Sequence, residues 1–241
     1  MIEVMANLFH QILYRPLLNV LVFFYNTIAF HDLGVAIALL AIFVRLILYP
    51  LFHKSTRHQT MLQRLQPHVK KISDTVKDKQ KQMEAIMALY KEHDVSLSSV
   101  YFVLILQFPF LIAIYGILRN LNSNFSKDLY SFIHAPAVLA PMFLGLINLA
   151  DKSILMVSLA AIAQYIQSII ALPKIQKGIT LTSQEKMTRR MVFLGPIITL
   201  VIFYRLPAAV SLYWFVTTLF SIGQQMLINK SLQSWNTGTT S

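Results

Sequence analysis

One arginine stands inside a long apolar segment of the sequence. The segment LGVAIALLAIFVRLILYPLF, residues 33–52, contains Arg45 and no other charged residue. A helix of that length matches the roughly 30 Å hydrocarbon core of a bilayer. A charge at that depth costs about 2.5–3.5 kcal/mol on insertion scales, so it usually faces water, a partner or the protein interior. Arg45 is therefore the first candidate for function, as a charge that attracts anionic groups. The alternative is structural: His53 follows about 12 Å later at helical rise, so the guanidinium can snorkel to the interface or bind backbone carbonyls.

Polar and aromatic side chains in the other apolar segments are the remaining candidates. They are Gln107, Gln164, Gln167, Tyr213 and Trp214, with Gln224 and Gln225 near the end of the last segment. Gln164 and Gln167 lie one helical turn apart and can share a face. Such amides either line a hydrophilic path or join helices through hydrogen bonds, which contribute about 0.6–2 kcal/mol each. The residues alone leave both possibilities open, and the same holds for the two aromatics, which can belong to an interfacial belt.

Patterns typical of enzymes and metalloproteins are missing from the sequence. It contains no cysteine, which excludes a disulfide framework, a Cys-ligated metal and a lipid-modified cysteine. The histidines between residues 53 and 97 lack metal-ligand spacing supported by acids, and no catalytic triad, phosphate loop or pair of intramembrane carboxylates occurs. We therefore expect no enzyme and no bound metal or cofactor.

The composition is that of an integral membrane protein. Of 241 residues, 56% are hydrophobic and only 13% are charged. The start, MIEVMANLFHQILYRP, carries Glu3 before any basic residue and has no small-residue cleavage site, so we expect the early apolar segment to stay in the mature chain.

The apolar segments and the charged stretches divide the chain. Residues 1–31 predict an interfacial amphipathic helix. Residues 53–97 hold nine basic and five acidic residues, with apolar residues at three- and four-residue steps, and predict a cytoplasmic antiparallel helical hairpin. The expected spans are 32–52, 98–118 and 153–172, followed by a two-span hairpin at 191–228. We expect the remaining segments to be an external loop at 119–152, a cytoplasmic loop at 173–190 and a short cytoplasmic tail at 229–241.

The distribution of positive charge predicts the topology. Residues 132–150 are long enough to span, but a crossing there would separate the basic hairpin from the basic loop at 173–190. Positive residues favour the cytoplasm, so we expect 132–150 to lie outside. This arrangement leaves fifteen of the 21 Lys and Arg residues inside and five outside. The predicted fold is an all-α membrane protein with five transmembrane helices, its N-terminus outside and its C-terminus inside.

Four stretches carry a resemblance to a known family. They are GVAIALLAIFVRLILYPL before the basic hairpin, LQPHVKKI, ALYKEHDVSLSSVYFVLILQFPFLIAIY and LPAAVSLYWFVTTLFSIGQQMLINK. Together they resemble the YidC/Oxa/Alb family of membrane protein insertases, from about Tyr14 to Lys230. The resemblance implies a hydrophilic groove open to cytoplasm and lipid, in which Arg45 attracts acidic residues of a substrate. Its implied lining is Arg45, Gln107, Gln164, Gln167, Tyr213 and Trp214.

The sequence departs from the family pattern at several points. Ala41 stands where many bacterial members have a threonine facing the groove, which implies a less polar groove near Arg45. Ala209 replaces a more usual glycine, so the local backbone geometry is uncertain from sequence. We also expect no large external domain, because only about 30 residues precede the first span.

These observations favour an insertase or chaperone in the bacterial plasma membrane. We expect a multi-pass protein that acts as a monomer on nascent membrane proteins at an anionic lipid surface. The Sec translocon, the ribosome and a targeting receptor are further candidate partners. One alternative is a small-anion transporter or channel that uses Arg45 as its binding charge, although the two halves of the chain differ. A scaffold that recruits partners through the hairpin is a third class, and it leaves Arg45 unexplained.

Overall fold

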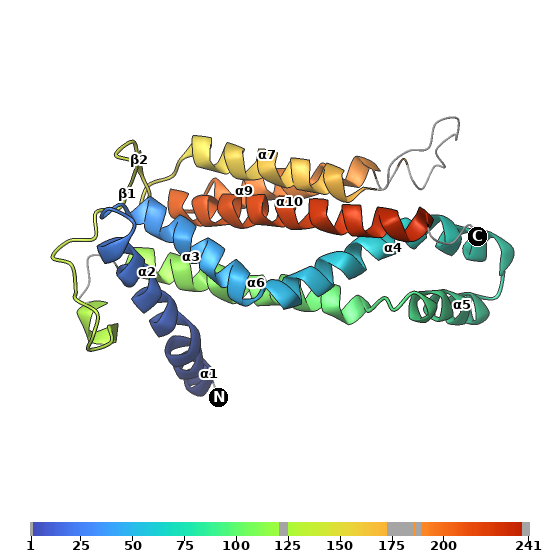
Figure 1. Cartoon of the computed structure of the whole chain (residues 1–241), viewed down its shortest axis with the longest axis horizontal. Helices are drawn as coiled ribbons and strands as arrows, with labels where there is room; N and C mark the ends of the chain where they lie inside the picture. The colour runs from blue at the N-terminus through green and yellow to red at the C-terminus, as the bar shows by residue number, and fades with distance from the viewer. Residues whose placement is uncertain (1, 121–124, 173–185, 187–188, 238–241) are drawn as a thin grey trace.

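The computed structural model describes residues 2–120, 125–172, 186 and 189–237 and is mostly helical (Figure 1). The helices are α1 (Ile2–Phe9), α2 (Arg15–Thr27), α3 (Leu33–Ile47), α4 (Tyr49–Thr75), α5 (Lys79–Glu92), α6 (Leu97–Arg119), α7 (Ile154–Ala171), α9 (Leu194–Phe203) and α10 (Ala208–Thr237). A π-helical turn, η1 (His10–Tyr14), joins α1 to α2, and a 3₁₀ turn, η2 (Phe125–Asp128), follows α6. Strands β1 (Met142–Phe143) and β2 (Ile147–Asn148) form one short antiparallel pair. The predicted helical class is confirmed.

Length and composition identify few of these helices as membrane spans. Within the described ranges, α7 alone is long and apolar enough to cross a bilayer. Helices α3 and α4 pass the same test only as a pair, and their axes differ by 75°. Helix α6 has 23 residues, of which Ile105–Arg119 is the apolar part with described side chains, and α9 has ten residues. Since a straight span needs about 20 residues, five spans and their orientation stay predictions.

The sharp bend lies inside the segment 32–52. Helix α3 ends at Ile47 and α4 begins at Tyr49. Pro50 accounts for the break, because it has no N–H to donate, its ring crowds the carbonyl of Leu46, and it disfavours helical geometry at the residue before it. Arg45 therefore lies in the last turn of α3, immediately before the bend.

Small residues let the central helices approach closely. Helix α10 packs along α7 and α3 (Figure 1). It begins with Ala208 and Ala209, whose small side chains are fully buried. Fully buried small residues occur on the packed helices: Ala36, Ala41, Ala113, Ala160, Ala208 and Ala209. Close packing of this kind replaces the hydrophobic driving force that is missing between helices in lipid. Ala209 is well accommodated, since its N–H donates to the carbonyl of Leu149 at 3.2 Å.

Helices α4 and α5 are joined by a short turn and contact each other, and α4 also contacts α10. Gln82 donates to the carbonyl of Ser73 at 3.0 Å and closes the turn. Met61 of α4 packs with Ile228 and Leu232 at the end of α10, while Met83 of α5 is 56% exposed. Helix α4 thus has two neighbours, and the antiparallel hairpin expected for residues 53–97 stays a prediction.

The N-terminal helices differ from each other in burial. One face of α2 is buried in the main core, including Leu18 and Val22. Val4, Met5 and Leu8 of α1 are exposed. The interfacial position expected for residues 1–31 therefore stays a prediction for α1, whereas α2 is an integral part of the bundle.

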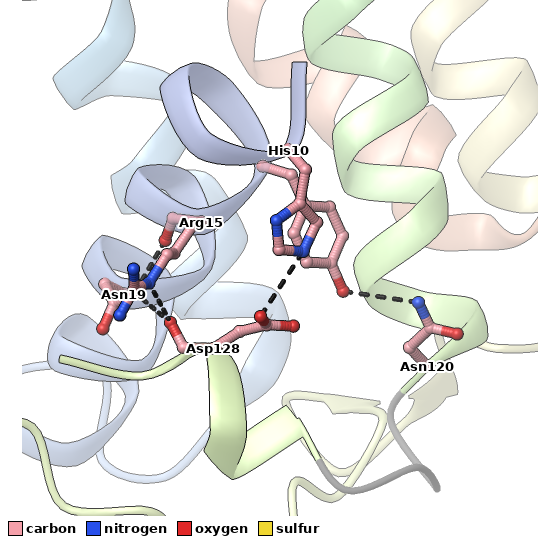
Figure 2. A network of polar contacts seen from close by, with 6 residues as sticks. His10, Arg15, Asn19, Asn120 and Asp128 are labelled. Carbon is pink, nitrogen blue, oxygen red and sulfur yellow. Dashed lines mark hydrogen bonds and ion pairs between the residues drawn. The ribbon is translucent and has the colours of Figure 1, made fainter. Parts of the chain in front are cut away.

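The segment between α6 and α7 covers one end of the bundle and contains no helix other than η2 in its described part, residues 125–153. Asn19 of α2 anchors it: its side-chain amide donates to Asp128 O at 2.9 Å and accepts from Tyr130 N at 2.6 Å. Arg15 Nε donates to the same Asp128 carbonyl at 3.1 Å, and His10 Nε2 lies 3.4 Å from the Asp128 carboxylate (Figure 2). Asp32, at the start of α3, accepts from Leu144 N. These bonds tie the segment to α2 and α3.

We expect Asn19→Ala to destabilise the protein by about 1–3 kcal/mol, because the Tyr130 N–H loses its acceptor and the Asp128 carbonyl keeps Arg15 but loses its second donor. Asn19 is 1% exposed, so water cannot replace the lost bonds. The measurement is the apparent melting temperature of the purified protein in detergent. Asn26→Ala is the control, since Asn26 makes a single bond, to the carbonyl of His134, at an exposed position. Equal losses in the two variants would contradict the anchoring role.

Candidate functional site

Arg45 is buried where α3 meets α4. Its side chain is 9% exposed, and its Cζ lies 4.0 Å from the centre of the Phe52 ring. Phe52 is in the first turn of α4 after Pro50, so the bend brings the ring under the guanidinium. A cation over an aromatic face gains about 0.5–2 kcal/mol, which offsets part of the burial cost of the charge. Within the described residues no carboxylate forms an ion pair with Arg45, and its Nε has no hydrogen-bond partner.

Two of the predicted site residues join Arg45 in one cluster. Gln107 of α6 donates to the hydroxyl of Tyr213 of α10 at 3.5 Å, and both side chains are buried. Tyr213 is near enough to Arg45 for the two groups to interact electrostatically. We name Arg45, Phe52, Gln107 and Tyr213 the arginine cluster. It combines one positive charge, one amide and one hydroxyl among apolar neighbours.

A second cluster lies on another side of α10. Gln164 Oε1 of α7 accepts from Thr199 Oγ1 of α9 and from Trp214 Nε1 of α10, the latter at 3.3 Å. The Trp214 ring also meets Phe203 edge-on, with 5.2 Å between centroids. We name Gln164, Thr199 and Trp214 the glutamine cluster. It joins three helices through one side-chain oxygen.

The six predicted residues therefore do not form one continuous site. Tyr213 and Trp214 are consecutive on α10 and point to different neighbours, α6 and α7 respectively. Gln167 is half-buried, and the structure records no hydrogen bond for it within the described part of the chain. Ala41, one turn before Arg45, is fully buried in the apolar core, in line with a less polar surrounding.

Buried polar residues follow one face of α10, and of these the sequence reasoning selected Gln225 but not the three hydroxyl residues. Ser211, Thr218, Ser221 and Gln225 are buried and recur at seven-, three- and four-residue steps. That spacing marks one helical face and was a usable signal. Gln225 donates to Thr60 of α4 at 2.8 Å, and Asn229 donates to the carbonyl of Ile170 of α7 at 2.8 Å. The face thus reaches from the core toward the charged end of the molecule.

Some buried polar atoms of α10 have no partner among the described residues. The hydroxyls of Thr218 and Ser221 donate to carbonyls one turn earlier on α10, as Ser and Thr often do in helices. Both polar atoms of the Gln224 side chain and the hydroxyl of Ser211 are buried and unpaired. Because a buried unpaired polar group costs about 1–3 kcal/mol, these atoms mark the interior positions with the greatest demand for polar partners.

Comparison with known proteins gives a consistent result. A model of the family described as 60Kd inner membrane protein matches residues 23–235. A relative named membrane protein insertase YidC, from Geobacter metallireducens, is 30% identical over 227 residues, covering 90% of this chain and 37% of that protein. The protein of the same name from Campylobacter jejuni is 31% identical over 217 residues, covering 90% of this chain and 37% of its own length.

A solved structure has the same fold. It is described as an active YidC insertase crystal structure with the first transmembrane domain resolved, and it matches with a TM-score of 0.63 at 24% identity. The match covers 89% of this chain and 45% of that chain. The present chain thus spans under two fifths of the length of these two curated relatives.

We expect Gln164→Leu to destabilise the bundle by about 1–3 kcal/mol, because Thr199 and Trp214 lose their shared acceptor. In a Trp235→Phe background Trp214 is the sole tryptophan, and its emission should shift to shorter wavelength when the amide is removed. Gln167→Leu is the matched control and should change the stability by less than about 0.5 kcal/mol. The same emission shift in both variants would rule out a specific Gln164–Trp214 contact.

Proposed function

Because the chain belongs to the 60Kd inner membrane protein family, we propose that it inserts membrane proteins into the bacterial plasma membrane. In this proposal it receives the hydrophilic tail of a substrate near Arg45 and releases the substrate's apolar segment into lipid. The relatives named as insertases support the activity, and the arginine cluster supplies a mechanism.

The observation that carries the proposal is a buried guanidinium with no acidic partner among the described residues. A permanent structural charge inside a protein is normally paired, because removing a lone ion from water is costly. The buried polar face of α10 runs from Ser211 to Gln225, about 20 Å at helical rise, so the polar character is extended. An extended polar strip with one positive charge fits a path for hydrophilic chain better than a point-like solute site.

Magnitudes favour a transient interaction with an acidic side chain. Two opposite charges 4 Å apart attract by about 4 kcal/mol at an effective dielectric constant near 20. Keeping the arginine unpaired in a membrane costs about 2.5–3.5 kcal/mol, which is similar in size. The contact between Arg45 and Phe52 contributes at most about 2 kcal/mol, so the guanidinium can leave the ring for a carboxylate. A substrate tail is therefore drawn in without being trapped.

The proposed topology follows from the charges. Helices α3, α6, α7, α9 and α10 would be the five spans, with the N-terminus outside. The described segment 125–153 would close the external end, and α4 and α5 would lie in the cytoplasm with nine Lys and Arg residues between 53 and 97. Helix α9, at about 15 Å, is shorter than the hydrocarbon core and would thin the bilayer beside it. Nascent membrane proteins are the proposed partners, and the monomer the proposed active form.

We expect Arg45→Ala to reduce insertion of substrates with acidic external tails about tenfold, the loss of one favourable charge contact. Arg45→Lys should retain most of the activity, because attraction of a carboxylate needs the positive charge more than the guanidinium fork. The measurement is insertion of small single-span proteins in cells depleted of their own insertase and supplied with each variant at equal expression.

Arg205→Ala is the control for this experiment, since Arg205 is an exposed arginine in the turn between α9 and α10. Wild-type insertion by the Arg45→Ala variant would contradict the charge-attraction mechanism. A photocrosslinker at Leu48, beside Arg45 at the bend, tests the function itself. Nascent membrane proteins should be captured there, whereas transport of a small anion without such capture would favour a transporter.

We also expect loss of insertion when residues 68–86 are replaced by a short Gly–Ser linker, because this part would receive incoming chains. The replacement keeps Thr60 and Met61, which contact α10, so the remaining bundle should stay folded. The apparent melting temperature in detergent separates loss of function from loss of fold. Full insertion activity with this linker would show that the tips of α4 and α5 are dispensable.

A further inference from the structure

A surface pocket of about 400 Å³ lies where α4 leaves the bundle. It is lined by Tyr49, Pro50, His53, Lys54, Arg57 and His58 of α4 and by Asp94, which follows α5. It is separate from the arginine cluster, because Phe52 points toward Arg45 and these residues occupy other faces of the same turns. The proposed insertion mechanism does not use it.

The lining of the pocket is basic. Lys54 and Arg57 are exposed and lie about one turn apart on α4, and Asp94 is the only acidic residue of the lining. One carboxylate against two permanent cations leaves a net positive site. An anion with several oxygen atoms can accept hydrogen bonds from Lys54 and Arg57 at the same time.

His58 adds a donor that the protein itself does not use. Its side chain is 4% exposed, its Nδ1 accepts from Ser96 N at 3.4 Å, and its Nε2 has no partner among the described residues. Burial lowers the pKa of His58, the nearby Lys54 lowers it further, and Asp94 opposes both effects, so the ring is neutral at pH 7. With Nδ1 accepting, Nε2 carries the proton. This atom is itself buried, so an oxygen atom of an occupant would reach the N–H once the imidazole turns toward the pocket.

His53 is a second imidazole with an unused polar atom. Its Nδ1 is buried without a partner in the described part of the chain, and its ring stacks on Tyr49 with 5.4 Å between centroids. The residues of the lining thus include two buried nitrogen atoms that lack partners in the described chain, beside two flexible cations.

The end of α5 holds the opposite wall in position. Asp94 has a left-handed backbone, φ 50°, and Val95 N donates to Tyr90 O at 2.8 Å. This turn brings Asp94 and Ser96 against α4, where the Ser96 N–H meets His58. The wall is therefore fixed by backbone bonds rather than by side chains alone.

The chemistry next to the pocket identifies the occupant. Leu46 and Ile47, at the end of α3, are 57% and 59% exposed and lead directly to Tyr49 and Pro50. A phospholipid carries its phosphate beside its acyl chains, so a phosphate in the pocket would leave the chains against this apolar surface. From this match we propose that the pocket binds the phosphate group of an anionic phospholipid. The position of the pocket at the membrane surface rests on the proposed function, but the binding itself does not.

The experiment measures binding of fluorescent phosphatidylglycerol to the purified full chain in detergent, with fluorescent phosphatidylcholine as the comparison lipid. The double variant Lys54→Gln/Arg57→Gln should bind phosphatidylglycerol about tenfold more weakly, because it removes two charge-assisted contacts. Lys70→Gln/Lys71→Gln is the matched control: it removes the same charge from the same helix outside the pocket, and it should bind as the wild type does.

Histidine variants test the buried donor. His58→Leu should weaken binding about fivefold and His58→Gln less, because a glutamine amide can still donate from a similar position. Binding is compared only between variants whose apparent melting temperature in detergent equals that of the wild type. If His58→Leu fails to fold, the Lys54→Gln/Arg57→Gln pair and His58→Gln still decide the outcome.

Four results would overturn the proposal. The first is that Lys70→Gln/Lys71→Gln weakens binding as much as Lys54→Gln/Arg57→Gln does, and the second is an equal affinity for phosphatidylcholine. The third is displacement of the lipid by an acidic peptide at a lower concentration than by unlabelled phosphatidylglycerol, and the fourth is displacement by inorganic phosphate at the concentration of the lipid. The last result would assign the pocket to free phosphate. Insertion is measured in parallel on the same variants. If the pocket variants lose lipid binding but insert proteins normally, the result supports the pocket as a lipid site that insertion does not need. If the wild type itself inserts no protein, loss of lipid binding in these variants still supports the pocket, and the proposed function is judged separately.

Discussion

The burial of one positive charge in an apolar bundle is the constraint on which the rest of the structure depends. Arg45 lies over the Phe52 ring and near Tyr213, whose hydroxyl accepts from Gln107, and no carboxylate pairs with it among the described residues. The bend at Leu48 makes this possible, because a straight helix would carry Phe52 about 10 Å away along its axis. The folded chain therefore tolerates the charge without neutralising it.

Helix α10 connects the parts of the site. Its consecutive residues Tyr213 and Trp214 enter two different clusters, and its small residues allow close contact with α3 and α7. Its buried polar face continues to Gln225, which bonds to Thr60 of α4. Any movement of α4 relative to α10 would therefore change both the arginine cluster and the polar face, since α4 supplies Phe52 to the first and Thr60 to the second.

The two ends of the bundle differ in a way that suits one-sided entry. At one end, the segment 125–153 is held by Asn19, Arg15 and Asp32 through bonds to its backbone, which fixes its position whatever its side chains are. At the other end, α4 and α5 are rich in charged residues and expose apolar side chains such as Met83. One end of the bundle is thus closed by a segment held through backbone bonds, and the other end presents a charged surface, so the two ends are not equivalent.

The sequence by itself determined the helical class, the position of the lone arginine and the separation of basic from apolar segments, because each depends on local composition and periodicity. It also carried the resemblance that the family match bears out. Only the tertiary structure decided that Met61 of α4 packs on α10, that Gln164 rather than Gln167 bonds to Trp214, and that Phe52 lies under Arg45. From the sequence, Pro50 indicates where the helix breaks but not the direction in which α4 leaves α3. These outcomes depend on which of several competing surfaces a helix meets, and that choice is made by packing between residues far apart in the chain.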